Sequence, residues 1–177
     1  MVQDIAGDQP GAYRAMYILG LAGAFSPEFQ EIRQTYRPLL ETFLDDGSDP
    51  MMARLALQIM CDDWGYAADC REFLLRFIHG VVWDAEDDVR QIAILLTGRY
   101  LRSHRDPELL AVLIRIFEDQ RGDDLVRQDA YLALADAVGR SWKELPSAAR
   151  EFNVDTDTDP RVLVEAKQRL ERAESFD

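Results

Sequence analysis

The sequence has few of the residue types that carry metal or nucleophilic chemistry. It contains two histidines and two cysteines among 177 residues. Neither His79 nor His104 belongs to a metal-ligand spacing or to a nucleophile motif with a cysteine or serine. A glycine-rich phosphate loop is also missing. The sequence therefore predicts a protein that is not an enzyme and that uses no metal ion or cofactor.

Long apolar runs are missing as well. No window approaches the uninterrupted apolar length of a membrane span, and the N-terminus lacks the basic start and apolar run of a secretory signal. We therefore expect a cytoplasmic protein. In that compartment we expect Cys61 and Cys70 to be two reduced, half-buried thiols and not a disulfide, although their placement permits contact.

Basic side chains are outnumbered by acidic ones, 20 to 33, which gives a formal net charge of −13. A field of this sign repels phosphate backbones and anionic lipid headgroups and attracts cationic proteins. We expect a cationic protein partner, no nucleic acid and no membrane. The content of hydrophobic residues, 47%, is typical of a folded chain, and the length fits a single domain over residues 1–177.

What the sequence does contain is a repeated segment. Three stretches, around Arg54, Arg90 and Arg127, are variants of one another. Arg90 follows Arg54 by 36 residues and Arg127 follows Arg90 by 37. This period is typical of stacked helical repeats.

Capping residues and apolar spacing predict an all-α chain of about nine helices. Apolar residues recur at steps of three and four, and no two-residue alternation indicates a strand. Proline after serine or aspartate marks several helix starts. The expected helices span residues 12–24, 27–44, 50–63, 66–82, 86–101, 107–119, 123–138, 146–152 and a last stretch from 160 whose acidic tail, 171–177, frays.

These segments resemble bacterial HEAT repeats. The resemblance is carried by the period, by the acidic residues before Val89-Arg90 and Leu125-Val126-Arg127, and by the alanine three positions after each of these arginines. It implies a right-handed α-solenoid of stacked antiparallel helix pairs. Residues 49–166 would form the repeats, 12–48 a divergent N-terminal cap unit, and 167–177 the C-terminal helix end and acidic tail.

The resemblance gives the three arginines a structural role. In helical repeats of this kind such arginines pair with acids at helix starts and link one unit to the next. We call Arg54, Arg90 and Arg127 the arginine ladder. Its expected partners are Asp49, Asp87 and Asp124.

The resemblance also indicates a binding surface, because HEAT-like proteins usually present the second helix of each pair on the concave side. Positions one and four after each ladder arginine form a mixed polar and apolar stripe suited to protein contact. Asp62 and Asp129 flank it. The stripe residues are Leu55, Gln58, Gln91, Ile94, Gln128 and Tyr131.

An acidic rim near the inter-helix turns is a second candidate feature. Trp64 follows Asp62 and Asp63 at a helix end, where it would bring an aromatic anchor to that rim. Doubled acids near turns offer a docking surface for a cationic partner.

One acidic run resembles the opening of a calcium loop, since Asp155, Asp157 and Asp159 alternate. The glycine and the bidentate glutamate of such a loop are replaced by Pro160 and Ala166, which argues against a calcium site. Asp159 is better interpreted as a helix cap.

The sequence as a whole favours a non-catalytic protein-binding module that presents an acidic, polar concave surface to a basic partner. An immunity or antitoxin protein is one specific form of this function. The alternatives are an adaptor or regulatory scaffold in a larger assembly and a HEAT-like enzyme such as a bilin lyase. The oligomeric state stays open, and a symmetric dimer could form through any exposed apolar patch.

Overall fold

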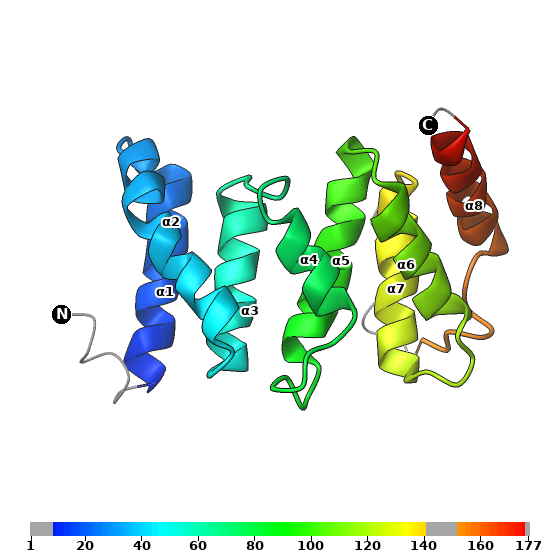
Figure 1. Ribbon diagram of the computed structural model, residues 1–177, viewed down its shortest axis with the longest axis horizontal. Helices are drawn as coiled ribbons and strands as arrows, with labels where there is room; N and C mark the ends of the chain where they lie inside the picture. Colours follow the sequence, from blue (N-terminus) through cyan, green and yellow to red (C-terminus); the bar gives the residue numbers. More distant parts are fainter. Residues whose placement is uncertain (1–8, 141–151, 176–177) are drawn as a thin grey trace. The chain divides into compact units, whose positions relative to one another are not determined.

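The computed structural model describes residues 9–140 and 152–175 of the chain. In these ranges all regular structure is helical and no strand occurs, which confirms the all-α prediction. The expected helix at 146–152 lies outside the described residues except for Phe152. The elements are α1 (Gln9–Phe25), α2 (Phe29–Asp46), α3 (Pro50–Gln58), the π-helical turn η2 (Ile59–Asp63), α4 (Arg71–Ile78), α5 (Asp88–Ser103), α6 (Pro107–Glu118), α7 (Asp124–Ala137) and α8 (Pro160–Glu174) (Figure 1).

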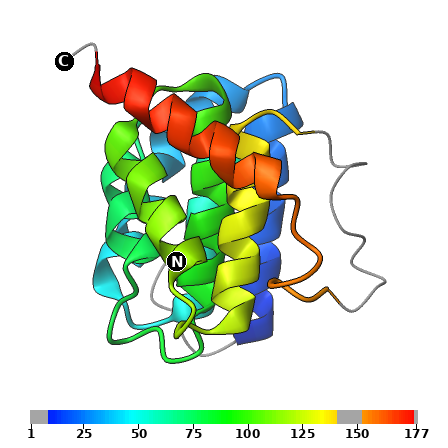
Figure 2. The same cartoon turned by 90° about the vertical axis from the view of Figure 1, so that its right-hand side faces the viewer.

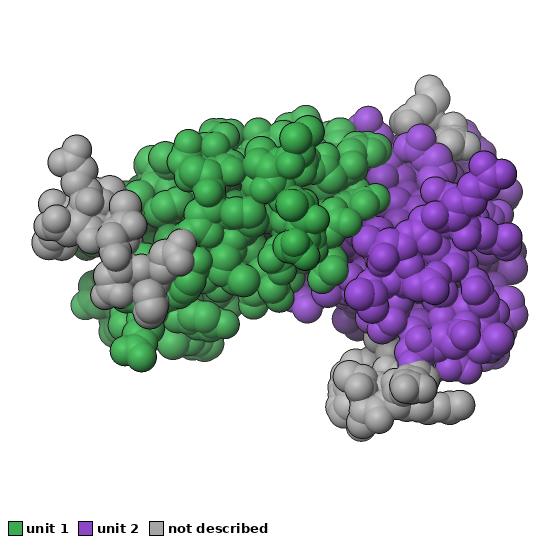
Figure 3. All heavy atoms as spheres, turned by 90° about the horizontal axis from the view of Figure 1, so that it is seen from below, with its two compact units in different colours: residues 1–92 green, residues 93–177 purple. Residues whose placement is uncertain are grey.

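The chain divides into two compact units, residues 1–92 (unit 1) and 93–177 (unit 2), and the boundary falls inside α5 (Figure 3). In unit 1, α1 packs beside α2, α3 and η2, and α2 also packs against α3. In unit 2, α6 and α7 pack together and α8 crosses both of them (Figure 2). Among the described residues, no helix is both long enough and apolar enough to cross a membrane.

Aspartate side chains cap four of the α-helices. Each accepts a hydrogen bond from a backbone amide two or three residues further on, as expected of a residue that precedes a helix. The predicted starts of α3, α6, α7 and α8 are therefore confirmed to within one residue. The capped amides are Met52 by Asp49 (3.1 Å), Leu109 by Asp106 (3.1 Å), Leu125 by Asp123 (2.8 Å) and Arg161 by Asp159 (2.9 Å).

The other four helix starts differ from the sequence prediction. α1 begins three residues earlier than expected, α2 begins two residues later, and α4 is shorter at both ends. α5 begins at Asp88 instead of Glu86, because the carboxylate of the buried Asp84 caps it from outside the helix. Asp84 accepts hydrogen bonds from the amides of Val89 (2.9 Å) and Arg90 (3.0 Å). Such a cap, set back in the preceding turn, has no sequence pattern that distinguishes it from a solvated acid.

Small residues allow the helices to approach one another closely. Ala56, Ala93 and Ala130, one in each repeated segment, are fully buried, as the repeat predicted. Gly98 of α5 lies directly against α7, since a β-carbon there would lie 2.5 Å from the Cα atom of Ala133. Only glycine fits at this point of contact between the two helices.

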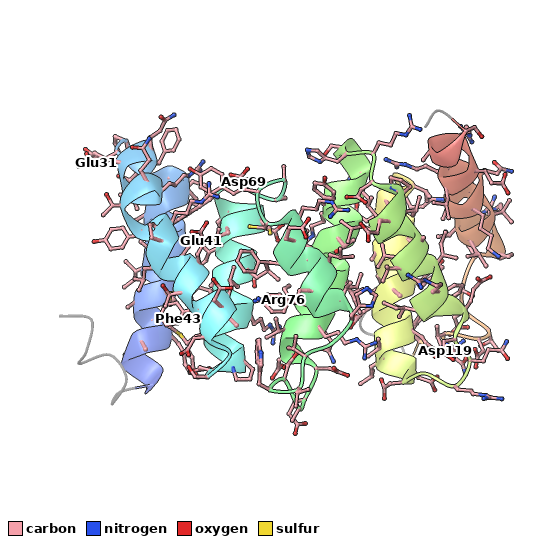
Figure 4. All side chains as sticks on the ribbon, viewed as in Figure 1. Glu31, Glu41, Phe43, Asp69, Arg76 and Asp119 are labelled. Atoms are coloured by element: carbon pink, nitrogen blue, oxygen red, sulfur yellow. The ribbon has the colours of Figure 1, made fainter. Side chains whose placement is uncertain are left out.

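Arginine side chains bind the carbonyl oxygens at the C-terminal ends of the helices. In unit 1, Arg33 donates to the carbonyl of Gly23 at the end of α1 (2.6 Å) and to that of Trp64 just after η2 (2.8 Å). Arg76, labelled in Figure 4, donates to the carbonyl of Leu44 in the last turn of α2. A cation at this end of a helix satisfies an orphan acceptor and complements the helix dipole.

The same arrangement recurs in unit 2. Arg169 of α8 donates to the carbonyl of Ala137 at the end of α7 and to that of Leu101 in the last turn of α5. Arg105, which follows α5, donates in turn to the carbonyl of Ala173 in the last turn of α8. Together with the ladder arginines described next, these contacts reach the ends of seven of the eight described α-helices.

Two ladder arginines combine a helix-end contact with the expected acidic partner. Arg90 pairs with Asp87 (3.4 Å) and donates from Nε to the carbonyl at the end of α4 (3.3 Å). Arg127 pairs with Asp124 (3.0 Å) and donates from Nε to the carbonyl near the end of α6 (3.4 Å). Each arginine therefore ties the start of its own helix to the end of the preceding one.

The prediction that Arg54 pairs with Asp49 is wrong. Arg54 lies 3.5 Å from Asp88 of α5 rather than against Asp49. The carboxylate of Asp49 is engaged in capping α3 and also accepts a hydrogen bond from the Tyr13 hydroxyl (3.4 Å). Arg54 is 40% exposed, so its ion pair is weaker than that of the buried Arg127.

The ladder arginines should differ in their contribution to stability. We expect Arg127→Ala to lower the free energy of unfolding by about 2–4 kcal/mol, because it removes a buried guanidinium with three acceptors. Arg54→Ala should cost less than about 1 kcal/mol, as for an exposed pair. Urea unfolding followed by circular dichroism measures both values. Equal losses for the two variants would contradict this ranking.

Candidate protein-binding site

Four of the residues proposed from sequence as partner contacts lie in the interior. Leu55, Ile94 and Tyr131 are 8, 0 and 3% exposed, and Trp64 is 2% exposed. The indole of Trp64 donates from Nε1 to the carbonyl of Gly20 (3.2 Å) and packs against α1. These four residues belong to the core, so the predicted stripe is not an accessible surface at these positions.

Tyr131 shows why periodicity misplaced the stripe. Its ring packs between those of Phe117 and Phe152, at 5.8 Å from each, and its hydroxyl accepts a hydrogen bond from the amide of Asp159 (3.0 Å). The loop before α8 therefore covers a helix face that the repeat pattern left open. A one-dimensional pattern does not reveal which loop covers a face.

The remaining proposed contacts are accessible but divide between the two units. Gln58 and Gln91 are partly exposed and lie in unit 1, together with the exposed Asp62 and Asp63. Partial burial raises the pKa of Asp63. Gln128 and Asp129 are partly exposed on α7 of unit 2.

The residues on α7 contribute to a pocket, which we call the α7 pocket. It is an open depression of about 340 Å³ between the first turns of α7 and the segment that leads to α8. Its size is at the lower end of the range for small ligands and suits one side chain of a partner. The lining residues are Asp124, Leu125, Gln128, Phe152, Asn153 and Val154.

The sequence pattern pointed to Gln128, which lines the α7 pocket, but it did not predict the apolar part of that pocket. Leu125 is 62% exposed in the first turn of α7. A leucine directly after two helix-starting acids was visible in the sequence, yet only the fold brings Phe152 and Val154 to the same place. The apolar lining therefore depends on tertiary structure.

Arg127 joins the first turn of α7 to the segment that leads to α8. Its guanidinium is 6% exposed and lies 3.0 Å from Asp124 and 2.6 Å from Asp155. The pKa of Arg127 is raised, chiefly by the hydrogen bond to Asp155. Burial opposes this shift, and the hydrogen bond to Asp124 adds to it. Because Asp124 and Asp155 are 80 and 61% exposed, their outer oxygen atoms still face solvent.

The acids before α8 each have separate partners. Asp155 pairs with Arg127, and Asp157 accepts a hydrogen bond from the amide of Asn153 (3.0 Å). Asp159 caps α8 and binds Arg161 (2.7 Å), which holds the pKa of that carboxyl at about 2. Among the described residues no group of three or more metal-ligating side chains comes together.

Asp129 has an unusual environment for a carboxylate on α7. Burial raises its pKa to about 6, and repulsion from Asp123 adds to the shift. Near neutral pH this group carries a charge that the folded state accommodates poorly. A positive group from a partner would relieve both effects, since an opposite charge favours the ionised form.

Cys61 and Cys70 are both free, buried thiols. A hydrogen bond between the two side chains, together with burial, raises the pKa of Cys61. A thiol in this state is a poor nucleophile. The pair therefore acts as part of the core of unit 1 and not as a reactive site.

Comparison of the chain with protein-family models, with curated proteins and with solved structures gave no match. The chemistry of the described residues is consequently the basis for assigning a function. Three apolar and three polar side chains line the α7 pocket, and one of the polar ones is the exposed carboxylate of Asp124. The pocket therefore offers a place for a side chain that is apolar along its stem and positive at its tip, as in lysine and arginine.

Replacement of Asp129 should stabilise the protein in a pH-dependent manner. Between its unfolded pKa near 4 and its folded pKa of about 6, the folded state binds more protons, so this group's contribution to stability is lost as pH rises. Asp129→Asn mimics the protonated form at every pH. After allowance for solvent screening we expect it to gain about 1–2 kcal/mol at pH 8 and almost nothing at pH 4.

Urea unfolding of the wild type and of Asp129→Asn at pH 4, 5, 6, 7 and 8 tests this expectation. The difference between the two proteins isolates one carboxyl from the many others that titrate in the same range. A difference that is constant over the whole pH range would contradict a raised pKa at Asp129.

Proposed function

We propose that this protein is a non-catalytic protein-binding module whose α7 pocket accepts a lysine or arginine side chain of a partner with a basic face. The observation that carries this proposal is that three apolar side chains and the exposed carboxylate of Asp124 line one depression. Leu125, Phe152 and Val154 would contact the aliphatic stem, and Asp124 would bind the charged tip.

The distribution of charge supports a cationic partner. Six arginines donate to helix-end carbonyls, and most of them are partly buried, so their hydrogen-bonding capacity is directed inward. Carboxylates at the turns remain exposed, as at Asp62 and Asp63 in unit 1 and Asp123 in unit 2. A net charge of −13 then acts on an incoming partner as a long-range attractive field for basic proteins.

A right-handed HEAT-like solenoid is the architecture that we infer for the chain. Support comes from the 36 and 37 residue spacing and from the equivalent contacts of Arg90 and Arg127, each of which joins a helix start to the preceding helix end. Consecutive helices tied in this way are typical of helical repeats. In this architecture the binding surface is built from accessible positions such as Gln128 and Asp129.

The most specific form of the proposed function is that of a cytoplasmic immunity or antitoxin protein. A small acidic protein can neutralise a cationic toxin such as a nuclease by covering its phosphate-binding face. An adaptor or regulatory scaffold in a larger assembly uses the same acidic surface. The two are distinguished by the partner, which is one toxin in the first case and a stable multiprotein complex in the second.

Affinity capture followed by quantitative binding tests the proposal. The protein is immobilised and exposed to lysate of its native source at 50 and 300 mM salt, and captured proteins are identified by mass spectrometry. We expect a basic protein that is lost at the higher salt concentration. Titration calorimetry of that protein should then show at least a tenfold loss of affinity for Asp124→Asn combined with Leu125→Asn.

Glu86→Gln is the matched control, because Glu86 is an exposed acid outside the α7 pocket. It removes one negative charge and should leave affinity within about twofold. An acidic partner, binding that is insensitive to salt, or unchanged affinity of the double variant would each contradict the proposed site.

A further inference from the structure

Of the described helices, α1 has the smallest fraction of charged residues. Arg14 is its single charged residue, whereas 30% of the whole chain is charged. α1 nevertheless exposes large apolar side chains along one face. These are Tyr17 (61% exposed), Ile18 (67%), Leu21 (56%) and Phe25 (82%), half of all the large hydrophobic side chains that are exposed in the described residues. We call these four residues the α1 face.

The opposite side of α1 is already packed, so the α1 face is not a misplaced core stripe. Ala12 and Met16 are buried there. A β-carbon at Gly23 would lie 2.2 Å from the indole nitrogen of Trp64, and the carbonyl of Gly20 accepts the hydrogen bond from that nitrogen. These contacts fix the rotation of α1 and leave the α1 face pointing away from unit 1.

The uncovered area is large enough for an interface. A fully exposed large apolar side chain presents about 150–250 Å², so the four exposed fractions leave roughly 500 Å² of apolar surface uncovered. This area matches the largest apolar patch of a typical monomer, and such patches are often functional. Two such faces together bury about 1,000 Å², the area at which specific interfaces begin, before any contribution from their rims.

We propose that a second copy of this chain covers the α1 face, in a symmetric dimer in which the two α1 helices pack antiparallel. The spacing of the α1 face is self-complementary about a point midway between residues 19 and 20. An axis at that point sets Ile18 against Leu21 of the partner subunit. It also brings Arg14 over the ring of Phe25 of the partner subunit, a cation–π contact.

The distribution of charge favours a second copy of the chain, and not a basic partner, as the occupant of the α1 face. α1 carries no carboxylate, so a cationic protein finds no opposite charge there. Two chains of net charge −13 repel one another over most of their surfaces, and they can approach closely only where acids are missing. The α1 face meets that condition. The proposal is independent of the α7 pocket, which belongs to the other unit.

Sedimentation velocity of the full chain at concentrations from 1 to 500 μM tests the proposal. This range is chosen because an interface of this size is expected to have a dissociation constant in the micromolar range. The weight-average mass should rise from 20.3 kDa toward twice that value. Leu21→Glu should raise the midpoint concentration about 100-fold, because each copy then places a carboxylate in the apolar interface. Val164→Glu, the same kind of change at an exposed site on α8, should leave the midpoint unchanged.

Disulfide trapping tests the antiparallel register even if Leu21→Glu fails to fold. A mixture of the Arg14→Cys and Phe25→Cys proteins, with oxidised glutathione as the oxidant, should form a cross-linked dimer at least tenfold faster than either protein alone. The wild type, whose own cysteines are buried, gives the background. Arg14 is too far from the axis to meet its own copy in this register.

Three results would overturn the proposal. The first is a chain that stays monomeric up to 500 μM. If this monomeric chain floats with vesicles of neutral phospholipid, lipid and not a second copy is the occupant of the α1 face. The second is a dimer that Leu21→Glu does not weaken. The third is cross-linking of the mixture that is no faster than that of the single variants.

Discussion

The hydrogen bonds from arginine to helix-end carbonyls are the interaction on which the rest of the structure depends. Every α-helix ends with acceptors that have no partner within the helix. In this chain a guanidinium from another element reaches those acceptors in seven of the eight described α-helices, and Arg33 and Arg169 each join two helix ends at once. The five donors of arginine, held in a rigid fork, make such double contacts possible where a lysine could not. Of the 20 basic residues only Lys143 and Lys167 are lysines.

This use of arginine determines the character of the surface. Six arginines direct their guanidinium groups toward helix ends, while Asp123 and Asp124 at the start of α7 remain exposed. The exposed carboxylates therefore lie mainly at the turns. Near the α7 pocket, Arg127 is buried while its partners Asp124 and Asp155 are exposed. The same charged surface that would attract a basic partner would keep copies of the chain apart, and α1, which carries no carboxylate, is the exception that would permit self-association.

The sequence predicted the local structure well where local physics decides it. Asp49, Asp106, Asp123 and Asp159 begin helices because an aspartate followed by a helical turn accepts backbone amides regardless of what surrounds it. Buried Ala56, Ala93 and Ala130 followed from the repeat. The prediction failed where a residue's role depends on segments far away in the chain. Trp64 was placed on a binding rim but fills the space beside Gly23, and Tyr131 was placed on a stripe but lies under the loop that precedes α8.

By itself the sequence determined the all-helical class, the four helix starts that an aspartate caps, the excess of acid and the period of the arginine ladder, because capping, apolar spacing and charge act over a few residues. Only the tertiary structure decided which of the marked residues are accessible. Leu55, Ile94 and Tyr131 satisfy the same spacing as Gln58, Gln91 and Gln128, yet the first three are core and the last three are partly exposed. The apolar half of the α7 pocket and the uncovered α1 face were likewise decided by packing, since burial is a property of what lies opposite a side chain and not of the side chain itself.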